Sequence, residues 1–266
     1  MRQIQPTDFK LPAFLTKTII DKEMKKLLIY AFFWSTLLSC SSDETPPLVP
    51  PLETLPDFSL ATFSNPTNIT NQYYGPKEGQ TLVYEGGEVG LEPEEEIRIE
   101  RLTDTYQVMG ITAIVQKDVV RLNGIIIEDT DDWLAQDDEG NLWYMGELAK
   151  NFQEDGTFID YEGSWEAGVD GALPGYWLPV NPQAGDEYMQ EYLEGEAEDY
   201  AIVVGYETVT IDLGTYDNCL VTKDINPFEP DEYELKYYAP GLGLIKEAKF
   251  EDEELVEVAE LVEIIE

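Results

Sequence analysis

Residues 133–147, WLAQDDEGNLWYMGE, predict how this chain folds. Two short segments rich in aromatic and aliphatic side chains, 133–137 and 142–147, flank the polar tetrapeptide DEGN at 138–141. Glycine adopts a positive φ at no steric cost, so Gly140 favours a tight turn between two antiparallel strands. This stretch is therefore the clearest β-hairpin in the sequence.

The same pattern of short apolar runs continues on both sides of this hairpin. Glycine, asparagine and aspartate interrupt the runs about every ten residues, which is typical of an all-β domain. We predict one antiparallel, strongly curved sheet, arranged as a half-barrel or a sandwich, over residues 73–266. Its other expected strands are 81–84, 97–102, 106–115, 119–128, 158–165, 187–192, 200–204, 207–213, 219–224 and 233–238.

The C-terminal residues 255–265, LVEVAELVEII, repeat two apolar residues and one polar residue. This period of three fits neither the helical period of 3.6 nor the strand period of 2. Valine and isoleucine favour a strand, and residues 243–250 with the polar segment 251–254 suggest a closing hairpin. A short amphipathic helix is the alternative.

The composition excludes several classes of function. The chain has 266 residues, of which 55 are acidic and 16 basic, with no histidine and two cysteines. Histidine-dependent catalytic triads and histidine-bound zinc are therefore impossible, and two cysteines do not make a disulfide framework. A net charge of −39 excludes nucleic acid as a partner, because phosphate binding needs a basic surface. The apolar fraction of 43% indicates a folded chain rather than an acidic disordered tail.

Residues 24–40 have the layout of a secretory signal peptide. Lys25 and Lys26 precede the apolar run 27–38, LLIYAFFWSTLL, and LLSC ends at Cys40. The run is too short to span a bilayer as a helix. The ending resembles a bacterial lipobox, which implies cleavage before Cys40 and lipidation of this cysteine, with acyl chains such as palmitate as the anchor. A short buried helix that ends in cysteine is the alternative.

The signal peptide divides the chain into four expected segments. Residues 1–23 are interpreted as a start codon placed too early, 24–39 as the lipoprotein signal peptide, 40–72 as a tether rich in proline, serine and asparagine, and 73–266 as the all-β domain. The sequence SSDE at 41–44 resembles the export tag of Bacteroidota lipoproteins. This resemblance implies an outer-membrane protein, lipid-anchored and either surface-exposed or facing the periplasm.

Three further motifs resemble those of a group of bacterial secreted proteins and lipoproteins that has no assigned activity. They are AQDDEGNLWY at 135–144, SWEAGVDGA at 164–172 and YYAPGLGL at 237–244. The resemblance implies an antiparallel-sheet domain, in some relatives a curved half-barrel like that of lipid carriers. It implies no reaction.

Trp165, Glu166 and Asp170 are candidates for binding a glycan. Carboxylates beside an aromatic ring suit sugar binding, and two carboxylates such as Glu166 and Asp170 could hydrolyse a glycosidic bond without a histidine. The alternative is a loop shaped by glycine and proline, in which tryptophan packs on the core and the acids face solvent.

Asp129, Asp131 and Asp137 are candidate ligands for Ca²⁺, which prefers six to eight oxygen ligands. Their spacing is not that of an EF-hand, and a solvated acidic face is the alternative. We expect no other cofactor.

The leading hypothesis is a membrane-anchored lipoprotein that acts as a non-enzymatic binding or envelope-associated module. The first alternative is a carboxylate-dependent enzyme active on glycans. The second is a carrier that shelters an apolar ligand in its curved sheet. The expected partners are the membrane, through the lipid anchor, and a glycan or an apolar ligand.

Overall fold

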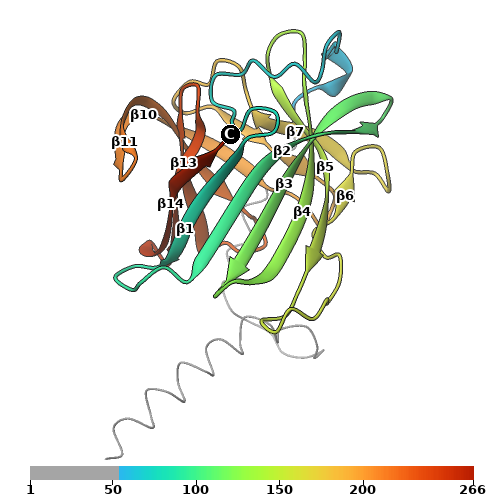
Figure 1. Ribbon diagram of the computed structural model, residues 1–266. Helices are drawn as coiled ribbons and strands as arrows, with labels where there is room; N and C mark the ends of the chain where they lie inside the picture. Colours follow the sequence, from blue (N-terminus) through green and yellow to red (C-terminus); the bar gives the residue numbers. More distant parts are fainter. Residues whose placement is uncertain (1–53) are drawn as a thin grey trace, which may run out of the picture. The chain divides into compact units, whose positions relative to one another are not determined.

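The computed structural model describes residues 54–266, and in this part of the chain fourteen β-strands form one antiparallel sheet (Figure 1). The predicted early start, the signal peptide and Cys40 lie outside the described residues. One short 3₁₀ helix, η2 (Phe58–Leu60), precedes the sheet. The strands are β1 (Thr81–Glu88), β2 (Glu95–Val108), β3 (Ile111–Leu122), β4 (Ile125–Gln136), β5 (Leu142–Asn151), β6 (Trp165–Glu166), β7 (Leu173–Leu178), β8 (Glu187–Met189), β9 (Glu191–Tyr192), β10 (Tyr200–Ile211), β11 (Gly214–Ile225), β12 (Glu232–Ala239), β13 (Gly243–Glu251) and β14 (Glu254–Ile265).

The sheet is nearly closed and barrel-shaped. Its order is β8-β10-β11-β12-β13-β14-β1-β2-β3-β4-β5-β7-β9, and β6 pairs with β5 outside this path. Only Gln190 separates β8 from β9 along the chain, yet β8 pairs with β10 and β9 pairs with β7. One short segment therefore joins the two ends of the order. The predicted all-β, single antiparallel, strongly curved sheet is confirmed.

The hairpin predicted around 138–141 is confirmed, because β4 pairs with β5 on either side of this turn. Several predicted strands have the wrong limits. Of segment 158–165 only Trp165 lies in a strand, β6; segment 187–192 is divided into β8 and β9; and segments 200–204 and 207–213 belong, as far as Ile211, to the single strand β10. Segment 106–115 contains the turn Met109-Gly110 between β2 and β3, and segment 119–128 contains the turn Asn123-Gly124 between β3 and β4. Both turns use residues with positive φ. The apolar residues beside each turn made it resemble a continuous strand.

The C-terminal segment forms the strand β14 and not a helix. β14 pairs with β13 on one side and with β1 on the other, so that Ile265 lies opposite Thr81. The register shifts between Val83 and Tyr84 of β1, because their partners Glu263 and Leu261 leave Val262 as an additional residue. A second additional residue, Val256, lies between the partners of Lys249 and Phe250, so the strand period of two is interrupted twice along β14.

Apolar side chains fill a large part of the interior. One cluster includes Leu134, Trp143 and Met145, and a second includes Tyr84 and Ile245. Residues 54–72, which the sequence places in the tether, contact the first cluster through aromatic rings: Phe58 and Phe63 lie edge-on to Trp143, with ring centroids 5.1 and 6.4 Å away. Among the described residues, no helix has the length and apolar character needed to cross a membrane.

Candidate functional site

Ionisable side chains line part of the inner face of the sheet. Arg101, Gln116, Asp132 and Glu147 are successive register partners on β2, β3, β4 and β5. Asp132 is buried, and its two carboxylate oxygens accept hydrogen bonds from Tyr144 Oη at 2.7 Å and Gln116 Nε2 at 3.2 Å. This row therefore places a carboxylate in the interior, beside the apolar core.

Burial changes the protonation of these interior acids. It raises the pKa of Asp132 to about 6, although the hydrogen bonds from Tyr144 and Gln116 act in the opposite direction. Burial, followed by the negative charge of Asp199, raises the pKa of Glu191 to about 8. Burial also holds the pKa of Glu147 well above its usual value. At neutral pH, Glu191 therefore keeps its proton, and burial shifts Glu147 in the same direction.

Lys236 is the centre of a second inner group, on strand β12. Its Nζ lies 3.1 Å from Glu234 Oε2, 3.6 Å from Asp224 Oδ2 and 3.7 Å from Glu247 Oε2. Burial acts to lower the pKa of Lys236, but these three carboxylates outweigh it and hold the pKa well above the usual value. Lys236 is therefore a permanent cation among carboxylates.

Two acids near Lys236, Glu247 and Asp199, are hard to ionise. Burial and the neighbouring Glu234 raise the pKa of Glu247 to about 7. Burial raises the pKa of Asp199 to about 7 even though Lys236 acts to lower it. One lysine does not balance this number of carboxylates, so these groups take up protons near neutral pH.

A cavity of about 190 Å³, here named the acidic pocket, opens beside Lys236. A smaller hollow of about 40 Å³ shares Glu234 and Lys249 with it and adds Glu95 and Glu257. Lys249 is already paired with Glu232 at 2.7 Å. The ionisable residues that line the acidic pocket are five carboxylates and two lysines: Asp199, Asp224, Glu229, Glu232, Glu234, Lys236 and Lys249.

Solvent reaches the acidic pocket. The side chains of Lys236 and Glu234, which line the pocket, retain 25% and 34% of their accessible surface, and the adjacent Glu247 retains 27%, although all three lie on the inner face of the sheet. A charged group of a ligand can therefore contact these carboxylates without disrupting the strands.

The structure places the predicted glycan-binding residues on different surfaces. Trp165 and Glu166 are neighbours on β6, and side chains of successive strand residues point to opposite faces. Trp165 is buried edge-on against Tyr144, with ring centroids 5.2 Å apart, whereas Glu166 accepts a hydrogen bond from Tyr106 Oη at 3.3 Å. Asp170 lies in an exposed turn with φ of +50°.

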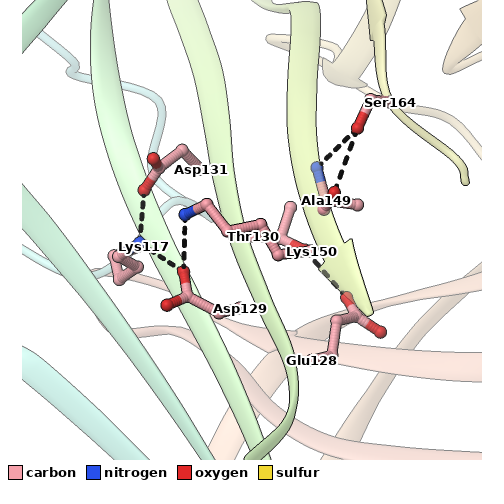
Figure 2. Close-up of polar contacts among 8 residues, drawn as sticks. All are labelled: Lys117, Glu128, Asp129, Thr130, Asp131, Ala149, Lys150 and Ser164. Carbon is pink, nitrogen blue, oxygen red and sulfur yellow. Dashed lines mark hydrogen bonds and ion pairs between the residues drawn. The ribbon is translucent and has the colours of Figure 1, made fainter. Parts of the chain in front are cut away.

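Lysines occupy the space beside two of the predicted Ca²⁺ ligands (Figure 2). Lys117 Nζ lies 2.5 Å from Asp129 Oδ1 and 2.7 Å from Asp131 Oδ1, and Lys150 Nζ lies 3.3 Å from Asp129. Partial burial raises the pKa of Asp129, but Lys117 and Lys150 outweigh it and lower the pKa overall. These residues alternate with Thr130 and Asp132 along β4, so they lie on its outer face.

Asp137 has a different environment from Asp129 and Asp131. It is buried directly after β4, and its carboxylate accepts five hydrogen bonds. It lies six positions after Asp131, about 20 Å along a strand, so one ion cannot contact both. Among the described residues, no group of three or more acidic or cysteine side chains is arranged to hold a metal ion.

The acidic pocket was not predicted from the sequence. The signal that could have revealed it is strand 232–239, EYELKYYA, in which Glu234, Lys236 and Tyr238 alternate with Tyr233, Leu235 and Tyr237. Neither face of this strand is purely apolar, which is unusual where one face lines a core. In a chain with 55 acids, such a pattern is hard to distinguish from a solvated face.

No protein-family model matches the chain, and no curated protein sequence matches it. Two solved structures are similar to it. One is a protein from Bacteroides fragilis NCTC 9343, described as exported and as having a YmcC-like fold, with 15% identity, a TM-score of 0.43, and coverage of 73% of this chain and 98% of that chain. The other, from Parabacteroides distasonis ATCC 8503, is described as a lipoprotein and has 15% identity, a TM-score of 0.44 and the same coverage. Neither description names a ligand or a reaction.

Proposed function

We propose that this chain is a lipid-anchored envelope protein that binds a small organic cation in the acidic pocket and catalyses no reaction. The observation that carries the proposal is a solvent-reached cavity lined by five carboxylates and two lysines. Both lysines already have acidic partners, Lys236 with Glu234 and Lys249 with Glu232. The excess negative charge favours a ligand that brings positive charge.

The size of the acidic pocket limits the ligand. Its volume of about 190 Å³ admits a small molecule. A short aliphatic amine meets this limit. A lining dominated by charged side chains gives no support to a carrier of apolar ligands at this place.

Proton uptake also supports a cationic ligand. The raised pKa values of Asp199 and Glu247 mean that protons neutralise part of the carboxylate charge near pH 7. A bound amine would supply that neutralisation instead, so binding should release protons and should weaken as pH falls. Asp199 forms no ion pair with a lysine or arginine of the described chain.

The envelope location rests on the sequence alone. The lipobox-like ending at Cys40 supports lipid anchoring, and the SSDE sequence at 41–44 supports the outer membrane as the destination.

Calorimetric titration of the purified full-length protein in detergent tests the binding. The probe is 1,4-diaminobutane, and the neutral diol of the same length is the matched ligand control. We expect the diamine to bind and the diol not to bind. The double substitution Asp199→Asn with Glu234→Gln should weaken the diamine about tenfold or more, whereas Glu207→Gln on an exposed part of β10 should leave it unchanged. No binding of the diamine, or equal binding by the double variant, would overturn the proposal.

A further inference from the structure

The acidic pocket opens at one end of the sheet, and six connecting segments border this end. Three of them, β1–β2, β3–β4 and β5–β6, lie at the lower end of the view in Figure 1. The six segments together are named the acidic rim. They contain no lysine or arginine and carry many acids. The segments are 89–94, 123–124, 152–164, 193–199, 226–231 and 252–253.

Backbone hydrogen bonds link parts of the acidic rim to one another and to adjacent strands. The β1–β2 segment is bonded to β14 and to the β3–β4 turn, the β5–β6 segment to β4, and the β13–β14 turn to the β11–β12 segment. These bonds are Val89 N to Val256 O at 2.9 Å, Asn123 N to Glu94 O at 2.8 Å, Phe152 N to Ile127 O at 2.9 Å and Asp252 N to Asp231 O at 2.9 Å. The rim is therefore held by the sheet, which gives a partner a defined surface.

Large apolar side chains on or beside the acidic rim remain exposed to solvent. They come from five of its six segments or from the strand residues next to them, and each exposes between 39% and 55% of its surface. Large apolar side chains exposed at the same end of the sheet as the acidic pocket favour an interaction surface there. The residues are Val89, Leu91, Ile125, Phe158, Ile159, Tyr161, Phe228 and Leu255.

A second hollow adjoins the acidic pocket at this rim. It measures about 340 Å³ and is lined by Tyr200, Pro227 and Pro230 together with charged groups. Both hollows share Ile225, Glu232 and Tyr233 as a common wall. One hollow is strongly acidic and its neighbour is partly aromatic, so together they suit a ligand with a cationic group next to a bulky apolar group.

The geometry points to a basic polypeptide as the partner: we propose that the acidic rim docks a chain whose lysine or arginine enters the acidic pocket while neighbouring apolar side chains contact the exposed rim residues. This proposal rests on the proposed cation binding and extends it to a ligand class. Charge decides between two possible partners of the rim, a cationic segment and an anionic membrane. A rim that has acids and no basic residue attracts the first and repels the second.

Fluorescence anisotropy of a labelled ten-residue peptide that alternates lysine with leucine and phenylalanine tests the docking, at physiological salt and with full-length protein in detergent. We expect the peptide to bind at least about tenfold more tightly than 1,4-diaminobutane, because it also buries apolar surface. A peptide with glutamate in place of each lysine should not bind.

A rim variant separates docking from binding in the acidic pocket. Leu91→Ser with Phe228→Ser should weaken the lysine peptide about tenfold and leave diamine affinity within about twofold, which also shows that the variant is folded. The matched control is Leu213→Ser, an exposed apolar residue in the β10–β11 turn at the opposite end of these strands.

Each remaining outcome has a defined meaning. If the diamine binds but the peptide binds no more tightly, or if the rim and control variants behave alike, docking is overturned and the proposed cation binding stands. If neither probe binds, both proposals fail. If protein without its lipid anchor sediments with zwitterionic vesicles and the rim variant abolishes this, the rim is a membrane surface and the docking proposal is overturned.

Discussion

Trp143 donates a hydrogen bond from its indole Nε1 to Asp137 Oδ2 at 2.9 Å, across the turn that joins β4 and β5. Three backbone N–H groups of the same turn, from Glu139, Gly140 and Asn141, donate to the other carboxylate oxygen. Because Trp143 is almost completely buried, this carboxylate fixes the turn to the apolar core.

Asp137→Ala should therefore destabilise the fold. The substitution leaves buried donors of Trp143 and the turn without partners, which should lower the free energy of unfolding by about 3 kcal/mol. Urea denaturation followed by tryptophan fluorescence measures this loss. The control is Glu139→Ala at the exposed neighbouring position, which should change stability by less than about 0.5 kcal/mol. Similar losses in both variants would contradict a structural role for Asp137.

Lys236→Met should destabilise the fold more at pH 8 than at pH 5. Without Lys236, the carboxylates of Asp224, Glu234 and Glu247 face one another without a cation, at a cost of about 3 kcal/mol when they are ionised. At pH 5 Glu247, whose pKa is raised to about 7 by burial and by Glu234, is protonated, so the loss should be smaller. Lys246→Met removes a lysine with one acidic partner, Glu260, and should cost less than about 1 kcal/mol. Equal losses at both pH values would argue against this explanation.

The protein should become less stable as pH rises from 5 to 8. The folded-state pKa values of Asp132, Asp199, Glu191 and Glu247, between about 6 and about 8, lie above those of unfolded Asp and Glu. The folded state therefore binds more protons in this range, and its extra stability, complete below about pH 4, is lost as pH rises through 6 to 8.

The shifted pKa values of Asp129 and Lys236 do not change the direction in which stability varies between pH 5 and pH 8. The lowered pKa of Asp129 affects stability only below about pH 4, and the raised pKa of Lys236 only above about pH 10. Urea midpoints at pH 5, 6, 7 and 8 measure how strongly stability depends on pH. Glu247→Gln should reduce this dependence. A midpoint that increases with pH would contradict the burial of these acids.

Cys40→Ser should abolish lipid attachment. We expect that cells fed radiolabelled palmitate incorporate label into the wild-type protein and not into the variant, and that the variant leaves the membrane fraction. Cys219→Ser is the matched control, because Cys219 is buried in β11 and cannot carry a lipid there. Label retained by Cys40→Ser would exclude this cysteine as the anchor.

Local sequence patterns predicted much of the sheet. The DEGN turn at 138–141 identified the β4–β5 hairpin because glycine and polar residues interrupted apolar runs clearly. The turns at Met109-Gly110 and Asn123-Gly124 were missed because Met109 and Ile125 continue the apolar pattern across them. Near-closure of the sheet was also unpredictable, because it depends on the pairing of β8 and β9 with strands distant in sequence.

The candidate site could not be predicted in the same way. Asp224, Glu234 and Glu247 approach Lys236 from three strands, and only register across β11, β12 and β13 brings them together. Asp129 and Asp131 form a visible acidic cluster in the sequence, yet Lys117 from β3 pairs with both. Side chains that are brought together only by strand register leave no local signature in the sequence.

The pairing of β1 with β14 has a consequence for how the chain acquires its fold. Thr81 lies opposite Ile265, so the first strand acquires its neighbour only when the last one has been made. When residues 81–250 have left the ribosome, β1 can pair with β2 alone. Its other edge stays unpaired. Slow folding is expected for such distant pairing, and a protein of this design would need its nascent edges shielded from other chains until β14 has been made.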